Sequence, residues 1–166
     1  MKKTKKTKGA KSKKIKRMGL DEYFLRIAKV IAKRATCRRH EIGVVIVRDK
    51  HILTTGYNGA GAGLKDCLEL GCLRDELNIP SGTRHEICRA IHAEQNAIIQ
   101  AGLHGVQTEN ATMYCTHSPC IICAKIIANA KIKRFVTCND YADKDFESLF
   151  KEAGIKFDKI KLKDEK

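Results

Sequence analysis

Two short strings in this sequence contain side chains that bind metals and move protons. The first reads His-Ala-Glu from position 92, and the second reads Pro-Cys-Ile-Ile-Cys from position 119. One imidazole and two thiolates suit zinc and leave its fourth coordination position open to a water molecule, whose pKa falls to about 7. We therefore expect His92, Cys120 and Cys123 to bind a catalytic zinc. Glu94 is expected to carry protons beside the metal without binding it.

The joint pattern is more specific than either string alone. A lone C-x-x-C also occurs in zinc ribbons and redox motifs. H-x-E followed by P-C-x-x-C is the known pattern of the zinc nucleobase deaminases. Both strings lie at the starts of expected helices, whose positive N-terminal ends favour thiolates. The alternative, a closed four-ligand zinc with Glu94 as a surface carboxylate, leaves the His-Ala-Glu string unexplained.

Composition separates a basic N-terminus from a nearly balanced body. The 166 residues include 33 Lys+Arg and 19 Asp+Glu, and ten of the bases with no acid lie in residues 1–17. We expect residues 1–17 to form a disordered basic tail with at most weak electrostatic contact to nucleic acid, and residues 18–166 to form one deaminase-type domain. No apolar run approaches the length of a membrane span, and the tail lacks the apolar core of a signal peptide. Eight cysteines without such a signal indicate a reducing, cytoplasmic setting.

Hydrophobic periodicity and turn residues predict alternating helices and strands. Alternation of this kind is typical of an α/β domain whose sheet is covered on both faces. Residues 58–89 are expected to be irregular, and a loop of this length needs something to hold it. The expected helices are residues 20–35, 92–101, 119–130 and 145–153, and the expected strands are residues 42–47, 51–57, 111–116, 132–138 and 155–160.

Four strings resemble those of deoxycytidylate deaminases, in the cytidine deaminase-like superfamily. They are GYNG from position 56, HAEQNAI from 92, MYCTHSPC from 113 and CAKIIANA from 123. The resemblance covers about residues 20–160. It implies a three-layer α/β/α fold around a mixed five-stranded sheet. It also implies hydrolysis of dCMP to dUMP and ammonia, which supplies the precursor of dTMP.

The resemblance also implies roles for individual residues. The catalytic zinc falls on the three ligands named above, with Glu94 as the proton shuttle. The implied substrate contacts are Asn58 for the deoxyribose 3′-hydroxyl, Arg39 (or Arg38) for the phosphate, the Ala93 N–H and Ser118 carbonyl for the base edge, and Tyr141 over the pyrimidine ring. An amide can both donate and accept a hydrogen bond, and a guanidinium can bind a phosphate through two donors.

Some members of the family carry a second, structural zinc. The residues at similar positions here are Cys37, Cys67, Cys72 and Cys88, with His85 as an alternative to Cys72. A closed site of four thiolates would satisfy zinc and hold the long loop. Cys115 and Cys138 lie in expected strands and are predicted to be core residues.

The sequence is also compatible with other functions. The enzyme alternatives are a deaminase of polynucleotides, of free cytidine or of a riboflavin precursor. The chain has 5% aromatic residues and no Trp, which argues against a platform for stacked bases. A non-enzymatic, zinc-stabilised module that binds DNA through the tail is a further alternative. The family resemblance also implies a homo-oligomer, a hexamer, with dCTP and dTTP as effectors and Mg²⁺ accompanying the nucleotide.

Overall fold

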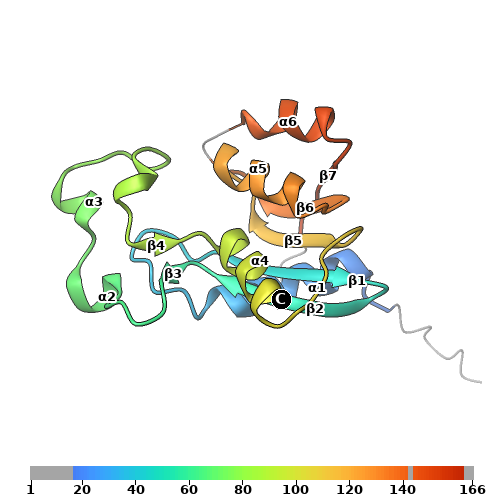
Figure 1. The fold of residues 1–166 in the computed structure, drawn as a ribbon, viewed down its shortest axis with the longest axis horizontal. Helices are drawn as coiled ribbons and strands as arrows, with labels where there is room; N and C mark the ends of the chain where they lie inside the picture. The colour runs from blue at the N-terminus through green and yellow to red at the C-terminus, as the bar shows by residue number, and fades with distance from the viewer. Residues whose placement is uncertain (1–16, 142–143, 163–166) are drawn as a thin grey trace, which may run out of the picture.

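A mixed sheet of five strands forms the centre of the molecule. The computed structural model describes residues 17–141 and 144–162, so the predicted tail, apart from Arg17, lies outside the described residues. The strand order is β2-β1-β5-β6-β7 (Figure 1). β1 pairs antiparallel with β2 and β5, whereas β5, β6 and β7 are parallel. The strands are β1 Gly43–Arg48, β2 His51–Tyr57, β5 Thr112–His117, β6 Arg134–Asn139 and β7 Lys156–Lys159.

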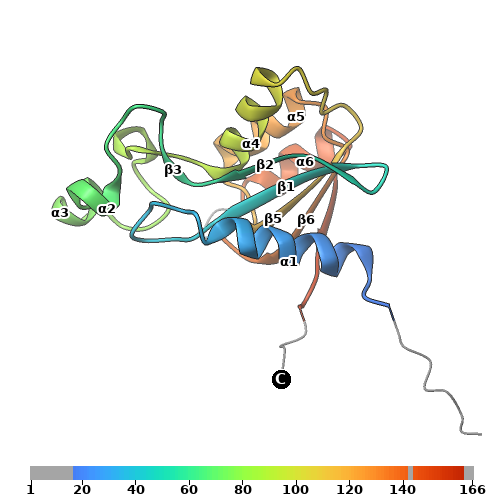
Figure 2. The ribbon, with the colours of Figure 1, turned by 90° about the horizontal axis from the view of Figure 1, so that it is seen from below.

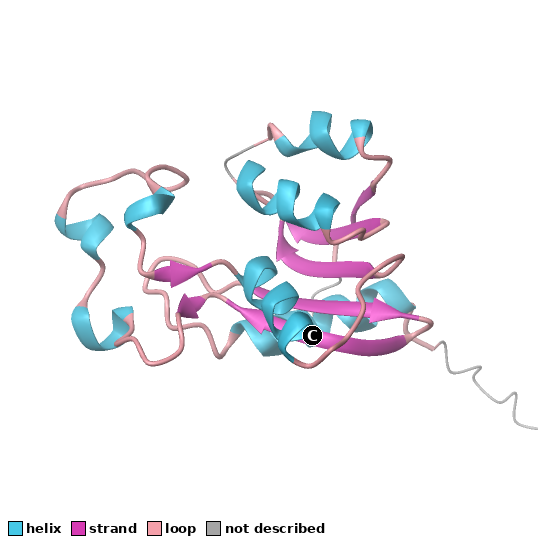
Figure 3. Ribbon diagram, viewed as in Figure 1, coloured by secondary structure: helices cyan, strands magenta, loops and turns pink. Residues whose placement is uncertain are grey.

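Helices cover both faces of this sheet. α1 (Leu20–Ala32) lies on one face, and α4 (Ala93–Leu103), α5 (Ile121–Asn129) and α6 (Phe146–Glu152) lie on the other (Figures 2 and 3). β1 contributes side chains to the core on both faces of the sheet, because successive side chains of a strand point to opposite faces. Val44 and Ile46 pack in the core on the α4 side, and Val45 and Val47 pack against α1. The three-layer α/β/α architecture with a mixed five-stranded sheet is therefore confirmed.

Residues 61–89, here called the insert, extend beyond one end of the sheet (Figure 1). A two-residue ribbon closes their base, where β3 (Gly59–Ala60) pairs antiparallel with β4 (Ala90–Ile91). Three short helices lie between, α2 (Cys67–Leu70), α3 (Leu73–Glu76) and the 3-10 turn η1 (His85–Ile87). The sequence predicted an irregular segment here and missed these short elements.

Two predicted helix boundaries are wrong in an informative way. The first helix ends at Ala32 instead of residue 35, because the chain then turns and the Thr36 N–H donates to the Asn58 carbonyl at 3.1 Å. α5 begins at Ile121, so Pro119 precedes the helix and Cys120 is its N-cap. The other predicted elements agree within about two residues, the usual uncertainty at element ends. Within the described residues, no helix is long and apolar enough to cross a membrane.

Candidate active site

Two helix N-termini meet beside the sheet and carry the expected metal ligands. His92 is the N-cap of α4, and its backbone N–H donates to the Gln95 side chain at 3.0 Å. Cys120 is the N-cap of α5, and Cys123 lies in the first turn of that helix. The first N–H groups of a helix lack intrahelical partners, so both ends present positive potential to the site.

The spacing of the three ligand atoms fits a zinc ion. His92 Nδ1 lies 3.5 Å from Cys120 Sγ and 3.3 Å from Cys123 Sγ. Tetrahedral zinc with ordinary Zn–N and Zn–S bonds would separate nitrogen from sulfur by about 3.6 Å. Among the described residues, these three form the only group of three or more His, Cys, Asp or Glu whose ligand atoms lie within 4.8 Å of one another. The donors and their spacing suit zinc with three protein ligands.

The electrostatics of the site favour a thiolate beside a buried carboxyl group. Hydrogen bonds from Cys123 and His92 lower the pKa of Cys120 to about 4, against the opposing effect of burial. The hydrogen bond to Cys120 raises the pKa of Cys123, as does burial. Burial raises the pKa of Glu94, which is only 4% exposed. Glu94 therefore has the increased proton affinity that suits a group exchanging protons near neutral pH.

A pocket opens in front of these residues. It contains ≈ 480 Å³ of empty space, including its mouth, and Glu94, His92 and Cys120 form part of its wall. The polar wall residues besides these include His40, Asn58, Arg74, His85, Ser118 and Tyr141. His40 precedes β1, whereas Asn58, Ser118 and Tyr141 follow β2, β5 and β6, and the strand register places all four at one end of the sheet. Arg74 and His85 belong to the insert, so the insert contributes one side of the pocket.

The predicted sugar contact, Asn58, is buried in the pocket wall. Its Nδ2 atom donates to the His40 carbonyl at 2.8 Å, and its Oδ1 atom accepts from the Ile42 N–H at 2.9 Å. An amide has a second donor hydrogen and a second lone pair. Asn58 is thus held rigidly and retains hydrogen-bonding capacity, and its contact with a sugar hydroxyl stays a prediction.

Three other predicted substrate residues lie near the metal ligands. Ser118 and Tyr141 line the pocket, and the Ser118 hydroxyl accepts a hydrogen bond from the Tyr141 N–H at 2.7 Å. Ala93 is fully buried as the first residue of α4, where its N–H has no intrahelical partner. Their contacts with a base stay predictions.

The predicted phosphate ligand, Arg39, does not belong to the described pocket wall. Its Nε atom lies 2.6 Å from Asp75 Oδ1, and its Nη2 atom donates to the Ile79 carbonyl at 2.8 Å. These contacts direct Arg39 to the insert. Arg38 is exposed. Neither arginine is placed at the metal ligands, and a phosphate role for either stays a prediction.

The four thiols predicted for a second zinc line two neighbouring hollows that share Cys88. Cys67, Cys72 and Cys88 line one hollow, and Cys37 and Cys88 line the active-site pocket. In the described residues no three of these sulfur atoms lie within 4.8 Å of one another. The second zinc therefore stays a prediction.

His85 packs against the predicted zinc ligand His92. Its assignment as an alternative to Cys72 in the second zinc site stays a prediction. Its ring centroid is 4.8 Å from that of His92, and both of its ring nitrogens are buried without a hydrogen-bond partner among the described residues.

The two cysteines predicted to be core residues differ in burial. Cys115 is fully buried, as predicted, and Cys138 is half-buried at the edge of the core on the α1 side.

Comparison with known proteins decides the family. The model of the cytidine and deoxycytidylate deaminase zinc-binding region matches residues 18–139. The chain belongs to this family. A curated relative of this deaminase, ComE operon protein 2 of Bacillus subtilis, is 38% identical over 149 residues, which cover 89% of this chain and 75% of the relative. The deoxycytidylate deaminase of Schizosaccharomyces pombe is 37% identical over 136 residues, which cover 81% of this chain and 42% of that enzyme.

A solved structure of the same family extends the comparison to three dimensions. The dCMP deaminase of cyanophage S-TIM5, crystallised with dCMP and dUMP, matches with a TM-score of 0.73 at 26% identity. The match covers 85% of this chain and 96% of that one. The three-layer fold of this deaminase is therefore shared with an enzyme whose structure contains a pyrimidine nucleotide.

Sequence reasoning missed two polar residues of the pocket wall. His40 and Arg74 line the pocket, yet neither belongs to a motif. His40 follows the end of α1, and Arg74 lies in a four-residue helix of the insert. Nothing in the spacing of the sequence connects them to His92, because only the tertiary fold brings the three residues to one pocket.

Proposed function

We propose that this protein is a zinc-dependent hydrolase that converts dCMP and water into dUMP and ammonia. The observation that carries the proposal is the group of His92, Cys120 and Cys123 with the buried Glu94 beside it. Membership of the deaminase family supports the reaction type. The relatives named deoxycytidylate deaminase, and the neighbour solved with dCMP and dUMP, support the substrate.

The residues divide the chemical work between them. His92 Nδ1 and the two cysteine sulfurs would hold the zinc, which when bound supplies Lewis acidity that activates water as a nucleophile. Glu94 accepts one proton from the attacking water and delivers it to N3 of the cytosine ring. It then takes the second proton from the hydroxyl group formed on C4 and delivers it to the departing amine, so that both protons of the water are accounted for in dUMP and ammonia. Its buried position raises its proton affinity for both transfers. Tyr141, at the pocket wall, closes over the pyrimidine ring.

The substrate contacts and the second metal belong to the same proposal. Asn58 binds the sugar, and Ala93 and Ser118 bind the base edge. A second zinc on the four thiols of Cys37, Cys67, Cys72 and Cys88 holds the insert in place. The placement of these thiols in two neighbouring hollows that share Cys88 supports that site.

The wider setting is proposed from the family resemblance and from composition. The enzyme works in the cytoplasm as a homo-oligomer, a hexamer, and responds to dCTP or dTTP together with Mg²⁺. Residues 18–166 form the deaminase domain. Residues 1–17 form a basic tail with weak affinity for nucleic acid, since their charge acts without regard to base sequence.

Replacing Glu94 tests the reaction. Glu94→Gln should lower kcat for dCMP by at least about 100-fold, because the amide cannot carry the proton. Zinc content should stay unchanged, because Glu94 is not a ligand. Glu152→Gln, at an exposed position on α6, is the matched control and should leave both values unchanged.

The measurements are ammonia release and zinc per chain, with dCMP, cytidine, CMP and a single-stranded oligonucleotide as substrates. Preference for the oligonucleotide would replace dCMP by a polynucleotide as the substrate. Absence of turnover on every substrate by the wild type would favour a non-enzymatic module. A second equivalent of zinc per chain would support the thiol site.

A further inference from the structure

Arg74 is a buried cation in the wall of the active-site pocket. It lies in α3, is only 5% exposed and lines the same pocket as His92 and Glu94. Its Nη2 atom donates to the Pro80 carbonyl at 2.9 Å, while its Nε atom is buried without a hydrogen-bond partner. Within residues 17–141 and 144–162, no carboxylate forms an ion pair with it.

A buried charge of this kind needs a partner. Removing a guanidinium from water is unfavourable unless an anion or several acceptors replace the water. Among the described residues of the pocket wall, Glu94 is the only acid, and it is placed for proton transfer at the metal ligands. The thiol of Cys120, whose pKa is lowered to about 4, belongs to the same metal-binding group. Neither of these two groups forms an ion pair with Arg74 in the described part of the chain, and an anion bound in the pocket would supply the missing negative charge.

We propose that Arg74 binds the 5′-phosphate of the nucleotide and thereby makes this enzyme prefer nucleotides to nucleosides. This inference rests on the function proposed above. A guanidinium presents parallel N–H donors that match two phosphate oxygens. Arg74 retains such donors, because its observed hydrogen bond uses Nη2 alone.

The surroundings of Arg74 place its charge toward the pocket. Burial lowers the pKa of His40, and the charges of Arg39 and Arg74 lower it further. Burial raises the pKa of Tyr141, and the charge of Arg74 opposes that rise. Both residues line the pocket, and their rings lie 5.9 Å apart. A phosphate at Arg74 would thus lie on the side of the pocket that Tyr141 and His40 form.

Arg39 takes a positioning role in this arrangement. It binds Asp75, which follows Arg74, and the carbonyl of Ile79, which precedes Pro80. The Pro80 carbonyl in turn accepts the hydrogen bond from Arg74. Arg39 therefore fixes both sides of the turn that presents Arg74, and it acts on the phosphate only through that turn.

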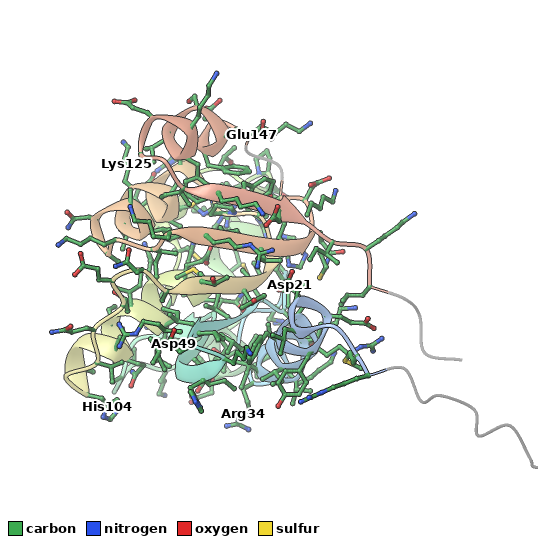
Figure 4. The ribbon with its side chains drawn as sticks, turned by 90° about the vertical axis from the view of Figure 1, so that its right-hand side faces the viewer. Asp21, Arg34, Asp49, His104, Lys125 and Glu147 are labelled. Atoms are coloured by element: carbon green, nitrogen blue, oxygen red, sulfur yellow. The ribbon has the colours of Figure 1, made fainter. Side chains whose placement is uncertain are left out.

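The test compares nucleotide with nucleoside. Arg74→Gln should lower kcat/KM for dCMP by about 100-fold, because it removes two charge-assisted hydrogen bonds. The value for deoxycytidine should change by less than about threefold, since that substrate has no phosphate. Arg74→Lys should retain part of the preference, because it keeps the charge but not the paired donors. Arg34→Gln, at an exposed arginine after α1, is the matched control and should change neither value (Figure 4).

Binding of dUMP and deoxyuridine, measured by calorimetry, makes the test independent of turnover. We expect Arg74→Gln to weaken the binding of dUMP and to leave the binding of deoxyuridine unchanged. The inference would fail if Arg74→Gln lowered kcat/KM equally for dCMP and deoxycytidine and weakened the binding of dUMP and deoxyuridine equally. Such a result would show that Arg74 only supports the fold. It would also fail if the loss specific to the phosphate appeared in Arg38→Gln or Arg39→Gln instead. Wild-type protein that binds dUMP through Arg74 but deaminates nothing would overturn the proposed function and leave the inference standing.

Discussion

The hydroxyl group of Ser118 connects the two chain segments that form one side of the pocket. Its oxygen accepts the hydrogen bond from the Tyr141 N–H, and the Ser118 N–H donates to the Asn139 carbonyl at 3.0 Å. Ser118 follows β5, and Tyr141 follows the neighbouring strand β6. The two bonds therefore fix the backbone that carries the Tyr141 ring relative to the metal ligands on α5.

Removal of this hydroxyl group should affect catalysis more than stability. Ser118→Ala loses one buried hydrogen bond, which is worth about 1 kcal/mol, and lets the Tyr141 segment move. We expect kcat/KM for dCMP to fall about fivefold. Ser148→Ala removes a hydroxyl that donates to the Asp145 carbonyl on the exposed side of α6, and should leave kcat/KM unchanged. Steady-state kinetics on both variants would contradict this role if the two behaved alike.

At the scale of residues, motifs located the metal ligands but not the rest of the pocket. His92, Cys120 and Cys123 were predictable because the chemistry of zinc requires those side chains at helix starts. Arg74 was not predictable, because a lone arginine in a loop is ordinarily a solvated charge. Its burial depends on how the insert folds beyond the end of the sheet.

At the scale of elements, two glycines let helices approach the sheet closely. A Cβ atom on Gly56 of β2 would lie 2.4 Å from the Ala93 carbonyl oxygen and 2.5 Å from the Ala97 nitrogen. A Cβ atom on Gly43 of β1 would lie 2.1 Å from the carbonyl oxygen of Ala28, in α1. Contacts below 3 Å with backbone atoms cannot be relieved by a side-chain rotation. The helix must move.

The substitution Gly56→Ala should displace the helix that carries His92 and Glu94. Forced contacts in a packed core cost about 1–3 kcal/mol, and here the obstructing atoms are backbone. We expect a lower thermal midpoint together with loss of zinc and activity from the protein that remains folded. Gly102→Ala, in α4 itself, meets no atom within 4 Å and should be neutral or slightly stabilising. Retention of full zinc content by Gly56→Ala would contradict this role for Gly56.

Periodicity predicted the long elements and failed for the short ones. The five strands and four covering helices were expected from apolar runs, helix-start residues and turn residues. α2 and α3 have four residues each and bury one residue apiece, Cys67 and Arg74. Helices this short are not stable alone, so tertiary contacts and the Asp66 N-cap determine them. No sequence period could have revealed them.

At the scale of the whole molecule, one polar network joins α1 to three strands. Asp21 accepts hydrogen bonds from the Tyr114 hydroxyl at 2.8 Å and from Arg134 at 2.8 and 2.9 Å. Arg134 also binds Asp158 at 2.6 Å. Asp21 lies at the start of α1, next to the sheet (Figure 4). The network thus fastens the first helix to β5, β6 and β7.

Acid should weaken this network. The hydrogen bonds from Arg134, opposed by burial, hold the pKa of Asp21 below its usual value. A carboxyl group with a lowered folded-state pKa stabilises the fold fully above about pH 4, and the effect disappears as pH falls through the lowered pKa. Asp21→Asn should therefore lower the free energy of unfolding by about 2 kcal/mol at neutral pH, and the difference from wild type should shrink below about pH 4.

Urea unfolding at several pH values measures this difference. Glu41→Gln removes an exposed ion pair with Lys33 and serves as the control, with a change below about 1 kcal/mol. A difference between Asp21→Asn and wild type that stays constant down to pH 3 would show that the charge of Asp21 is irrelevant.

The insert joins the rest of the domain through the short ribbon of β3 and β4. Two residue pairs, Gly59 with Ile91 and Ala60 with Ala90, close the segment that contains Arg74 and His85. The entropy of closing a loop rises only slowly with its length. Segments of other lengths and sequences, grafted at the same ribbon, would leave the sheet and the metal ligands in place. Exchange of this segment would therefore change which ligands the same hydrolytic site binds, while the rest of the fold stays the same.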